Sequence, residues 1–487
     1  MPLYLFLHEL HQYEGNAISY NLFKPKVKSF KHITHYFNRH PFLFLITKER
    51  SLFGIMNFHT TQKNVLFFRI TDKTENIHQD TDYFHITLNV PKTDIFSCQK
   101  TIFATNIHKH TMAGIYIHIP FCKTRCIYCD FYSTTRSELK QQYIRALCTE
   151  LKTRKGYLKE EPIETIYFGG GTPSQLAHED FEQIFRTIKE VYGTEHAEEI
   201  ILEANPDDLT EEYVSMLRTL PFNRISMGIQ TFDAPTLKLL NRRHNAAQAI
   251  AAIHRLRQAG FRNISIDLIY GLPDETDQRW ERDLQQAVGL DVEHISAYHL
   301  TYEKGTRIYE MLQSHRISEV DEESSVRFFS ALMDTLGAAG YEHYEISNFC
   351  KPGMYSRHNT AYWKGIPYLG CGPSAHSFNA ETREWNTASL EGYIKSIEEG
   401  QRSSETEILD KVTRYNEYIM TSLRTMWGVS LTYTEEAFGT ELRQYCTKMA
   451  APYLQSHKLE MQADRLHLTR EGIFVSDGII SDLMFIE

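Results

Sequence analysis

From residue 115 onward, short apolar segments alternate with longer segments whose apolar residues recur at helical spacing. Helical spacing is clear in 181–191 and in 247–259, which Gly260 ends. Asp208, three residues before Glu211, resembles a capping box that starts another helix. The apolar segments predict strands at Ile115–Ile119, Thr165–Phe168, Ile200–Glu203, Arg224–Ile229, Ile264–Ile269 and His294–Leu300. This alternation predicts an α/β fold with a parallel sheet, closed or partly closed, whose functional groups lie at the C-terminal ends of the strands.

The first 111 residues have a different character. They hold two glycines and two alanines, but thirteen phenylalanines and ten histidines. Strand-like runs occur at Phe42–Ile46, Val65–Ile70 and Phe84–Val90. Two interpretations are open for residues 1–111: a small extra N-terminal domain, or translated upstream sequence with Met112 as the true start. The shift in composition favours the second, and we see no chemistry in this extension.

A third region begins near residue 380. Residues 414–423 have a helical pattern, and 466–472 reads as a strand followed by a turn. We therefore divide the rest of the chain into a barrel at 112–380 and a C-terminal α+β, winged-helix-like module at 381–487. Because the chain is acidic, we expect this module to pack on the barrel or dock a protein partner rather than bind DNA.

Composition narrows the expected binding partners and cellular compartment. The net charge of −10 gives no reason to expect nucleic-acid binding. No apolar run reaches the ~18 residues that cross a bilayer, and the N-terminus lacks a secretory signal, so we expect at most peripheral membrane association. Eight cysteines, three of them clustered, suit a reducing compartment, which predicts a cytoplasmic protein.

The clustered cysteines carry the strongest chemical signal. Cys122, Cys126 and Cys129 supply three thiolates within eight residues. Thiolates are the usual ligands of iron–sulfur clusters, and three of them leave one iron of a four-iron cubane open to a small molecule. The layout resembles that of radical S-adenosylmethionine (SAM) enzymes. A zinc knuckle or three buried cysteines is the alternative, but the paired motifs or added histidines of zinc sites are missing here.

A glycine run follows the second predicted strand. Gly169-Gly-Gly-Thr-Pro173 lies at its C-terminal end, where glycine lets a ligand approach the backbone and bare amides can bind polar groups. A tight strand-to-helix turn explains such a run equally well. Placed after the cysteine loop, the run resembles the Gly-Gly-Glu-Pro-type motif of radical SAM enzymes, which holds the methionine amino group.

Polar residues mark the ends of later strands. Glu203 ends the third strand, Gln230 follows the fourth, and Asp267 lies in the fifth. A polar group at the end of a buried strand is costly unless it is paired, so each is a satisfied structural residue or a ligand-binding one. Their common position favours a ring around a ligand. Arg242, twelve residues after Gln230, is a solvated helix charge or an anion clamp at the same mouth.

Longer runs extend the likeness. From Met112 to its end, the chain resembles the oxygen-independent coproporphyrinogen III oxidase family of radical SAM proteins, through the runs at 116–122, 168–174, 225–232, 267–273 and 298–306. The resemblance implies a partial (β/α)6 radical SAM barrel and a 4Fe–4S cluster on Cys122, Cys126 and Cys129, with SAM on the open iron. It implies further that SAM meets Tyr116, Gly170, Gly171, Thr172 and Glu203. Positions that hold a second SAM in the oxidases correspond to Tyr128, Gln230, Arg242 and Asp267.

Two features separate this chain from the oxidases. The oxidases have a further cysteine two residues after the third ligand, where this chain has Phe131. The Cys-Asp-Phe form resembles the heme chaperone branch of the family, and His358-Asn-Thr-Ala-Tyr-Trp363 resembles the His-Asn-x-x-Tyr-Trp motif of that branch. Imidazole or phenolate can ligate heme iron and tryptophan can pack on a porphyrin, so the resemblance implies heme contacts at His358, Tyr362 and Trp363. His376 and Cys371 are secondary candidates.

The first hypothesis is therefore a heme chaperone on a 4Fe–4S and SAM-binding scaffold. It would hold heme as cargo and pass it to apo-hemoproteins such as respiratory cytochromes, with an electron donor protein as a further partner. The second is an oxygen-independent coproporphyrinogen III oxidase that uses a 5′-deoxyadenosyl radical, and a third is a radical SAM enzyme acting on another substrate. Phe131 and the segment 358–363 favour the first, and whether the chain is an enzyme stays open.

Overall fold

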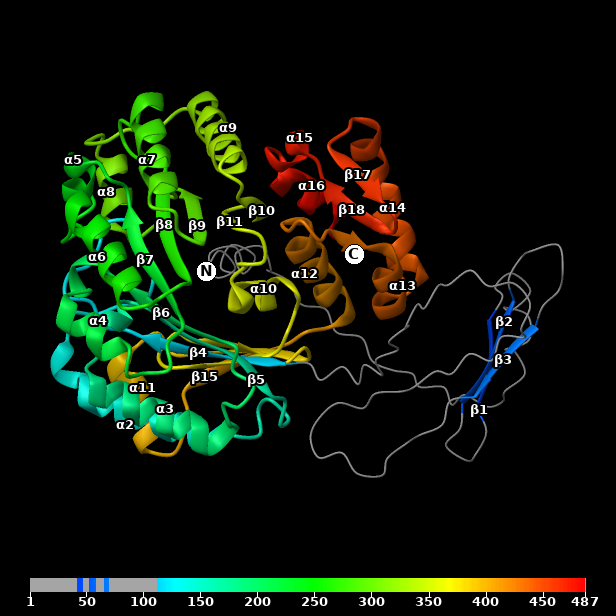
Figure 1. Ribbon diagram of the computed structural model, residues 1–487, viewed down its shortest axis with the longest axis horizontal. Coiled ribbons are helices and arrows are strands. Elements are labelled where there is room, and N and C mark those ends of the chain that lie inside the picture. Colours follow the sequence, from blue (N-terminus) through cyan, green and yellow to red (C-terminus); the bar gives the residue numbers. More distant parts are fainter. Residues whose placement is uncertain (1–41, 47–51, 58–64, 70–111, 487) are drawn as a thin grey trace, which may run out of the picture. The chain divides into compact units, whose positions relative to one another are not determined.

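The computed structural model describes residues 42–46, 52–57, 65–69 and 112–486 (Figure 1). They fall into two units, which are described separately. In the first, β1 (Phe42–Ile46), β2 (Leu52–Asn57) and β3 (Val65–Arg69) form an antiparallel sheet in the order β1-β2-β3. β1 and β3 were predicted and β2 was not. The predicted strand Phe84–Val90 lies outside the described residues.

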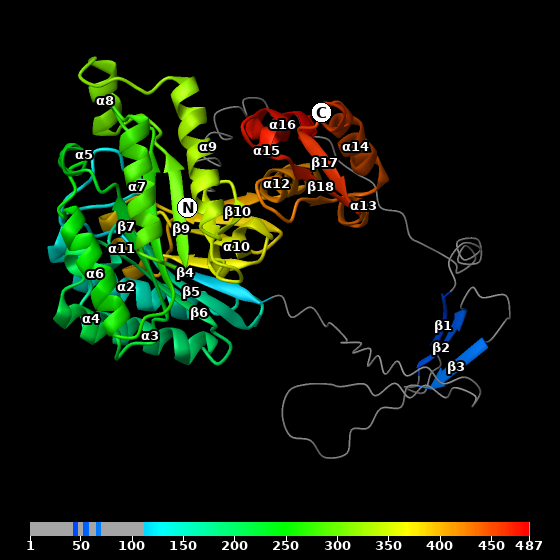
Figure 2. The same cartoon turned by 45° about the horizontal axis from the view of Figure 1, so that its top comes forward.

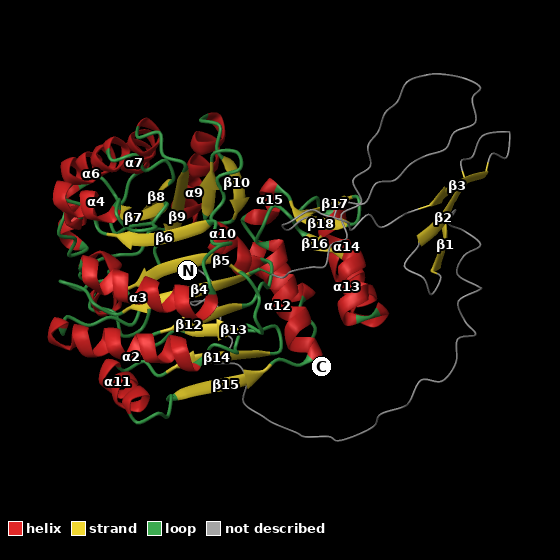
Figure 3. Cartoon of the chain, turned by 60° about the horizontal axis from the view of Figure 1, so that its bottom comes forward, coloured by secondary structure: helices red, strands yellow, loops and turns green. Residues whose placement is uncertain are grey.

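The second unit is built on a twelve-stranded sheet in the order β10-β11-β9-β8-β7-β6-β5-β4-β12-β13-β14-β15 (Figure 3). Its centre consists of six parallel strands, all of them predicted from the sequence, and it confirms the partial barrel. They are β4 (Ala113–Ile119), β5 (Ile163–Gly170), β6 (Glu199–Ala204), β7 (Arg224–Gln230), β8 (Ile264–Tyr270) and β9 (His294–His299).

Shorter strands extend both edges of the barrel. β12 (Tyr368–Cys371) runs parallel to β4, and the antiparallel strands β13 (His376–Phe378), β14 (Thr382–Asn386) and β15 (Ser404–Ile408) follow it. At the other edge, β11 (Asn348–Cys350) pairs with β9 and with β10 (Glu342–Glu345). The boundary predicted at residue 380 therefore falls inside one continuous sheet.

Helices connect the strands, and α7 packs against α9 beside β8 and β9 (Figure 2). They are α2 (Lys140–Thr153), α3 (His178–Tyr192), α4 (Glu211–Leu217), α5 (Ala234–Leu239), α6 (Ala246–Gln258), α7 (Asp277–Gly289), α8 (Arg307–Gln313), α9 (Glu322–Ala338), α10 (Arg357–Trp363) and α11 (Leu390–Glu398). Three short 3-10 helices add η3 (Ser137–Leu139), η4 (Pro173–Gln175) and η5 (Pro206–Asp208) to the described part of the chain. Gly260 follows α6 with φ +93°, as predicted.

The capping box predicted at Asp208 is wrong. Thr210 is the N-cap of α4, and its side chain accepts a hydrogen bond from Tyr213 N at 3.2 Å. Asp208 instead belongs to η5, and its carboxylate binds side chains of other segments. The local sequence pattern gave a wrong cap because the Asp208 carboxylate forms hydrogen bonds with residues far away in the chain.

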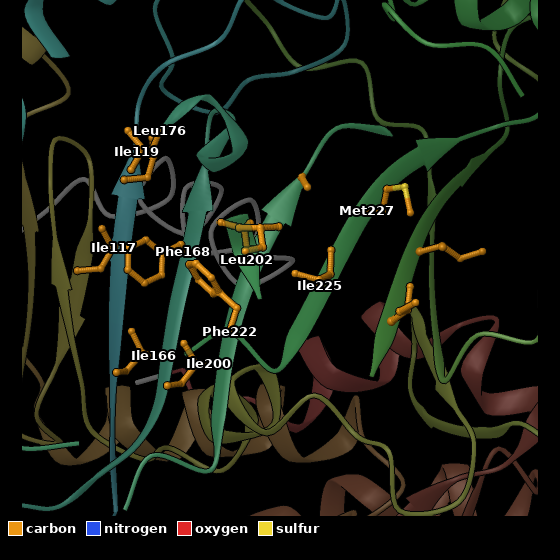
Figure 4. Close-up of a cluster of buried hydrophobic side chains, with 14 of the residues drawn as sticks. Ile117, Ile119, Ile166, Phe168, Leu176, Ile200, Leu202, Phe222, Ile225 and Met227 are labelled. Carbon is orange, nitrogen blue, oxygen red and sulfur yellow. The ribbon is translucent and has the colours of Figure 1, made fainter. Parts of the chain in front are cut away.

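The two faces of the barrel strands differ sharply. On one face, apolar side chains of β4 to β7 gather in a buried cluster (Figure 4). The same cluster includes residues of α2 and α3. On the other face, alternate positions carry Tyr167, Glu203, Ser226, Asp267 and Tyr298 around a cavity of about 40 Å³. Because side chains alternate along a strand, one sequence of residues supplies both the core and a polar barrel interior.

The C-terminal part contains a small antiparallel sheet in the order β16-β18-β17, flanked by helices. Its elements are α12 (Lys411–Leu423), β16 (Val429–Ser430), α13 (Leu431–Phe438), α14 (Thr440–Gln455), β17 (Leu459–Gln462), β18 (Arg465–Leu468), α15 (Arg470–Ile473) and α16 (Ser476–Leu483). The predicted helix and strand at 414–423 and 466–472 correspond to α12 and β18. Among the described residues, none of the helices combines the length and the apolarity that a membrane span requires.

Candidate functional site

The cysteine loop follows β4, at the C-terminal end of the barrel. Backbone hydrogen bonds hold it on both sides: Cys122 N donates to Thr134 O at 2.9 Å, and Ile127 N donates to Leu240 O at 3.3 Å. Cys122, Cys126 and Cys129 are partly exposed, whereas the other cysteines of the described residues are buried. The loop therefore presents three thiols at the mouth of the barrel.

Two of these thiols accept hydrogen bonds from residues of neighbouring loops. Thr172 Oγ1 donates to Cys122 Sγ at 3.3 Å, and Arg242 Nη1 donates to Cys126 Sγ at 3.3 Å. Asn205 joins the two donors, since its Nδ2 donates to Thr172 Oγ1 at 3.4 Å and its Oδ1 accepts from Arg242 Nη2 at 2.7 Å. Side chains from three loops are thus arranged to stabilise negative charge on sulfur.

Three thiols at the mouth of the barrel form a donor set that suits an iron–sulfur cluster, because thiolates are the usual ligands of such clusters. Within the described part of the chain, no three His, Cys, Asp or Glu side chains are grouped as they would be around one metal ion. A four-iron cubane is wider than an ion, and its thiolates stand farther apart. Burial raises the pKa of the Cys122 thiol and raises that of Cys129 to about 12.

The glycine run forms a turn against Glu203, the penultimate residue of β6. Gly170 N donates to Glu203 Oε2 at 3.1 Å, and Tyr167 donates its hydroxyl to Glu203 Oε1 at 2.6 Å. Gly170 has φ +104°, and a Cβ at Gly171 would lie 2.9 Å from the carbonyl oxygen of Ile119. Backbone conformation and close packing therefore require glycine at both positions. Burial raises the pKa of Glu203 to about 7, while the Tyr167 hydrogen bond acts in the opposite direction.

The remaining predicted ring residues surround the same mouth. A Cβ on Gly228 would lie 2.7 Å from Gln230 Nε2 and 3.3 Å from Arg242 Nη2, which places both side chains beside β7. Tyr128 lies next to Cys126 and Arg242. Arg242 Nε is buried and has no hydrogen-bond partner among the described residues, so one donor of this guanidinium is left for a ligand.

Asp267 lies deeper in the barrel, on the wall of the polar cavity. Ser226 Oγ approaches its Oδ1 at 3.5 Å, and burial raises the pKa of this carboxyl to about 6. Tyr116 also faces the barrel interior, where its hydroxyl pairs with His118 Nδ1 at 3.1 Å. The structure therefore brings the cluster cysteines and the predicted SAM residues to one end and one interior of the barrel.

His358 lies at the other end of the strands. It belongs to α10 and stands over Gly114 and Thr165, which are paired near the starts of β4 and β5. The cysteine loop begins eight residues after Gly114, and strands rise about 3.3 Å per residue. The heme-motif residues are thus not grouped with the cluster cysteines. Tyr167 lies between His358 and the site near the cysteine loop. Its ring centroid is 5.0 Å from that of His358, and its hydroxyl donates to Glu203.

The His358 imidazole is enclosed. The residue is 1% exposed, Nδ1 pairs with Thr165 Oγ1 at 2.7 Å, and Nε2 pairs with Tyr362 Oη at 2.8 Å. Burial lowers the pKa of His358 to about 3, so the ring is neutral. The backbone N–H of His358 donates to Glu199 Oε1 at 3.0 Å, and Glu199 also pairs with the buried Arg224 at 3.5 Å. Both ring nitrogens that could ligate iron are occupied in this conformation.

Trp363 completes α10. It is 4% exposed, and its Nε1 has no hydrogen-bond partner within the described residues. Buried indole N–H groups normally find an acceptor. Both ring nitrogens of His358 therefore have hydrogen-bond partners, whereas the indole N–H of Trp363, on the same helix, has none among the described residues.

Sequence reasoning missed Asn205 and Asp208. Both follow β6 in the run Asn205-Pro-Asp-Asp208, at the C-terminal end of a barrel strand. An Asn-Pro pair after a strand signals a turn, and turns at this end of the barrel carry function. That signal was available and would have placed both residues near the cysteine loop.

Comparison with known proteins gives the family. The profile of the Radical SAM superfamily matches residues 116–287, and that of the HemN C-terminal domain matches residues 409–475. Heme chaperone HemW of Bacillus subtilis is 33% identical over 371 residues, which is 76% of this chain and 98% of that protein. Heme chaperone HemW of Lactococcus lactis is 32% identical over 370 residues, 76% of this chain and 96% of that protein. The chain belongs to the HemW family.

A solved structure supports the HemW fold independently. Coproporphyrinogen III oxidase (HemN) from Escherichia coli, a radical SAM enzyme, matches 77% of this chain and 90% of its own with a TM-score of 0.67. The two sequences are 22% identical, so this likeness concerns the fold alone. This chain thus shares the HemN fold, and Phe131 occupies the position at which the oxidases were expected to have a further cysteine.

Proposed function

We propose that this protein is a heme chaperone built on a radical SAM scaffold. Its relation to the curated HemW proteins, which extends over nearly their whole length, carries the proposal. Phe131 and the helix α10, with the His-Asn-x-x-Tyr-Trp motif, support it from within the chain. Heme is the cargo and apo-hemoproteins are the recipients, with respiratory cytochromes as the expected class and an electron donor protein as a further partner.

Cys122, Cys126 and Cys129 are the proposed ligands of a 4Fe–4S cluster. When bound, such a cluster would supply one-electron chemistry at an open iron. The protein contributes the hydrogen bonds that Thr172 and Arg242 donate to sulfur, which favour negative charge on the thiolates.

SAM is assigned to the mouth between the cysteine loop and the cavity. The Glu203 carboxylate, at the turn of Gly170 and Gly171, would pair with the SAM ammonium group, with Tyr116 and Thr172 beside it. Tyr128, Gln230, Arg242 and Asp267 would meet a second SAM, and the unpartnered Nε of Arg242 is a donor that such an anion-bearing ligand could use.

Heme capture at His358 requires α10 to change position. The residue is buried and its Nδ1 is paired with Thr165 of β5, so iron cannot reach this nitrogen while α10 stays in place. Nε2 is paired with Tyr362 of the same helix, so a movement of α10 frees Nδ1 rather than Nε2. The ring is neutral, which is the form that ligates iron. Tyr362 and Trp363 move with the same helix and would complete the heme contacts.

The C-terminal module is proposed to dock recipients. We place its start after β15, near residue 409, because β14 and β15 belong to the barrel sheet and the HemN C-terminal profile begins there. α12 of this module contacts α10, so a partner bound to the module lies close to the helix that carries His358.

Anaerobic reconstitution followed by heme titration tests the proposal. We expect a stoichiometric heme absorbance change in the wild-type chain and a weaker one in His358→Ala. Turnover of coproporphyrinogen III to vinyl products without heme retention would overturn it in favour of the oxidase alternative.

A further inference from the structure

Asp208 lies where four segments around the cysteine loop meet. Its side chain is 2% exposed. Oδ1 accepts from Lys123 Nζ at 2.8 Å, and Oδ2 accepts from Ser174 Oγ at 2.9 Å, Gln175 Nε2 at 2.6 Å and Arg243 Nη2 at 3.0 Å. Both carboxylate oxygens are therefore hydrogen-bonded, Oδ1 to one donor and Oδ2 to three.

The contacts with Lys123 and Ser174 fix the two segments next to the Cys122 thiol. Lys123 directly follows Cys122 in the cysteine loop. Ser174 is two residues after Thr172, whose hydroxyl donates to Cys122 Sγ. Moving Asp208 would therefore displace both the thiol and its hydrogen-bond donor.

The contact with Arg243 fixes the segment that carries the hydrogen-bond donor of Cys126. Arg243 directly follows Arg242, whose guanidinium donates to Cys126 Sγ and to Asn205 Oδ1. Asn205 starts the same turn that contains Asp208, and Arg243 also pairs with Asp207. The turn after β6 is thus fixed to the segment that carries Arg242 at two points.

We propose that Asp208 is a positioning residue for the iron–sulfur site, and this inference rests on the proposed function. Its carboxylate sets the positions of the donors on Cys122 and Cys126, and it does not touch either thiol. Charge-assisted hydrogen bonds are strong, and those in a buried setting resist distortion. Hydrogen bonds to cluster sulfurs tune the reduction potential, so Asp208 influences cluster retention and redox behaviour through its partners.

The charges around Asp208 are balanced by neighbouring side chains. Lys123 and Arg243 supply two cations, while Asp207 and Asp208 supply two carboxylates. Lys123 is itself 56% exposed at its side chain, so an ion pair there would contribute little if Asp208 were equally exposed. Because Asp208 is buried, loss of one cation leaves a desolvated carboxylate with incomplete compensation.

Asp208→Asn and Lys123→Met, each in the full chain, test the inference, with Lys123→Arg as the conservative variant. The probe is the 4Fe–4S cluster reconstituted anaerobically with iron and sulfide. We measure iron per chain, the rate of iron loss to a chelator, and the electron paramagnetic resonance spectrum of the reduced cluster. We expect iron loss about 10- to 100-fold faster in Asp208→Asn and Lys123→Met, with a changed spectrum, and recovery in Lys123→Arg.

Lys159→Met is the matched control, because Lys159 pairs with Glu381 at 2.9 Å on the surface and touches none of these segments. It should lose iron at the wild-type rate. Circular dichroism and thermal unfolding report folding, and Lys123→Met decides the matter if Asp208→Asn does not fold. Folded variants with wild-type iron loss and spectrum would overturn this inference and leave the proposed function standing. A wild-type chain that takes up no cluster would overturn both.

Discussion

Replacing Thr165 by valine should make heme capture easier. The Thr165 hydroxyl is paired with His358 Nδ1 at 2.7 Å, and both residues are 1% exposed. Valine has nearly the same shape, but it offers no hydrogen-bonding atom. The imidazole therefore stays in the protein while its hydrogen bond to the barrel is removed, and its other partner, Tyr362, belongs to α10 itself.

The magnitude follows from the burial of this pair. A neutral hydrogen bond contributes about 1 kcal/mol, and a buried nitrogen left without a partner costs ~1–3 kcal/mol. A loss of about 2 kcal/mol from the closed position of α10 raises its open fraction about 30-fold, since 1.4 kcal/mol is a factor of ten. The apparent dissociation constant for heme equals the intrinsic constant divided by the open fraction, so it should fall by the same factor.

Heme titration by absorbance measures this change, and amide hydrogen exchange in α10 reports the opening. Thr187→Val is the matched control: Thr187 is 5% exposed and donates to Gln183 O at 2.9 Å within α3, away from α10. His358→Ala should instead bind heme more weakly, because the iron ligand is gone. If Thr165→Val binds heme no more tightly than the wild type, the closed-helix explanation is wrong.

Three further outcomes are expected. SAM affinity measured by equilibrium dialysis should rise between pH 6 and 8, because the pKa of Glu203 is raised to about 7 and only its ionised form pairs with an ammonium group. Tyr167→Phe should move the midpoint to higher pH, because the Tyr167 hydrogen bond lowers the pKa of Glu203, and a pH-independent affinity would contradict the assignment. Gly170→Ala should destabilise the fold by ~2–4 kcal/mol in urea unfolding, since its Cβ would lie 2.7 Å from an imidazole carbon at φ +104°, whereas Gly260→Ala, at φ +93° in open space, should cost about 1 kcal/mol; equal losses would refute the steric argument. Glu199→Gln should lower the free energy of unfolding by ~3–5 kcal/mol, because its arginine partner stays buried and unbalanced, and a loss below ~1 kcal/mol would show that the pair is unimportant.

The six central strands were predictable because period and order are local properties. Each strand is a short apolar run, and the helices between them have their own spacing, so the parallel arrangement follows from the sequence. The same holds for the grouping of Glu203 and Gln230 with the cysteine loop, since strand ends in such a sheet meet at one edge. Arg242, twelve residues after Gln230, was expected to return to the same mouth, and it lies there after α5. Position along a strand was enough to predict which residues meet.

Long-range contacts were not predictable in this way. Asp208 has the spacing of a capping residue, yet Lys123, 85 residues earlier in the chain, takes its carboxylate. The extension of the barrel sheet by β14 and β15 was missed because antiparallel edge strands carry no signal of the sheet they join. Likewise, the motif of His358 predicts a ligand but not its enclosure, which depends on Thr165, 193 residues away.

The position of Tyr167 in the barrel wall has a thermodynamic consequence. Its hydroxyl is bound to Glu203 at the proposed SAM site, and its ring lies against His358 at the proposed heme site. A ligand that shifts the ring at one site changes the free energy at the other, and linkage makes this change reciprocal. If SAM alters heme affinity tenfold, heme must alter SAM affinity tenfold, about 1.4 kcal/mol in each direction. Heme binding and SAM binding would then be thermodynamically coupled, so that the occupancy of either site sets the affinity of the other.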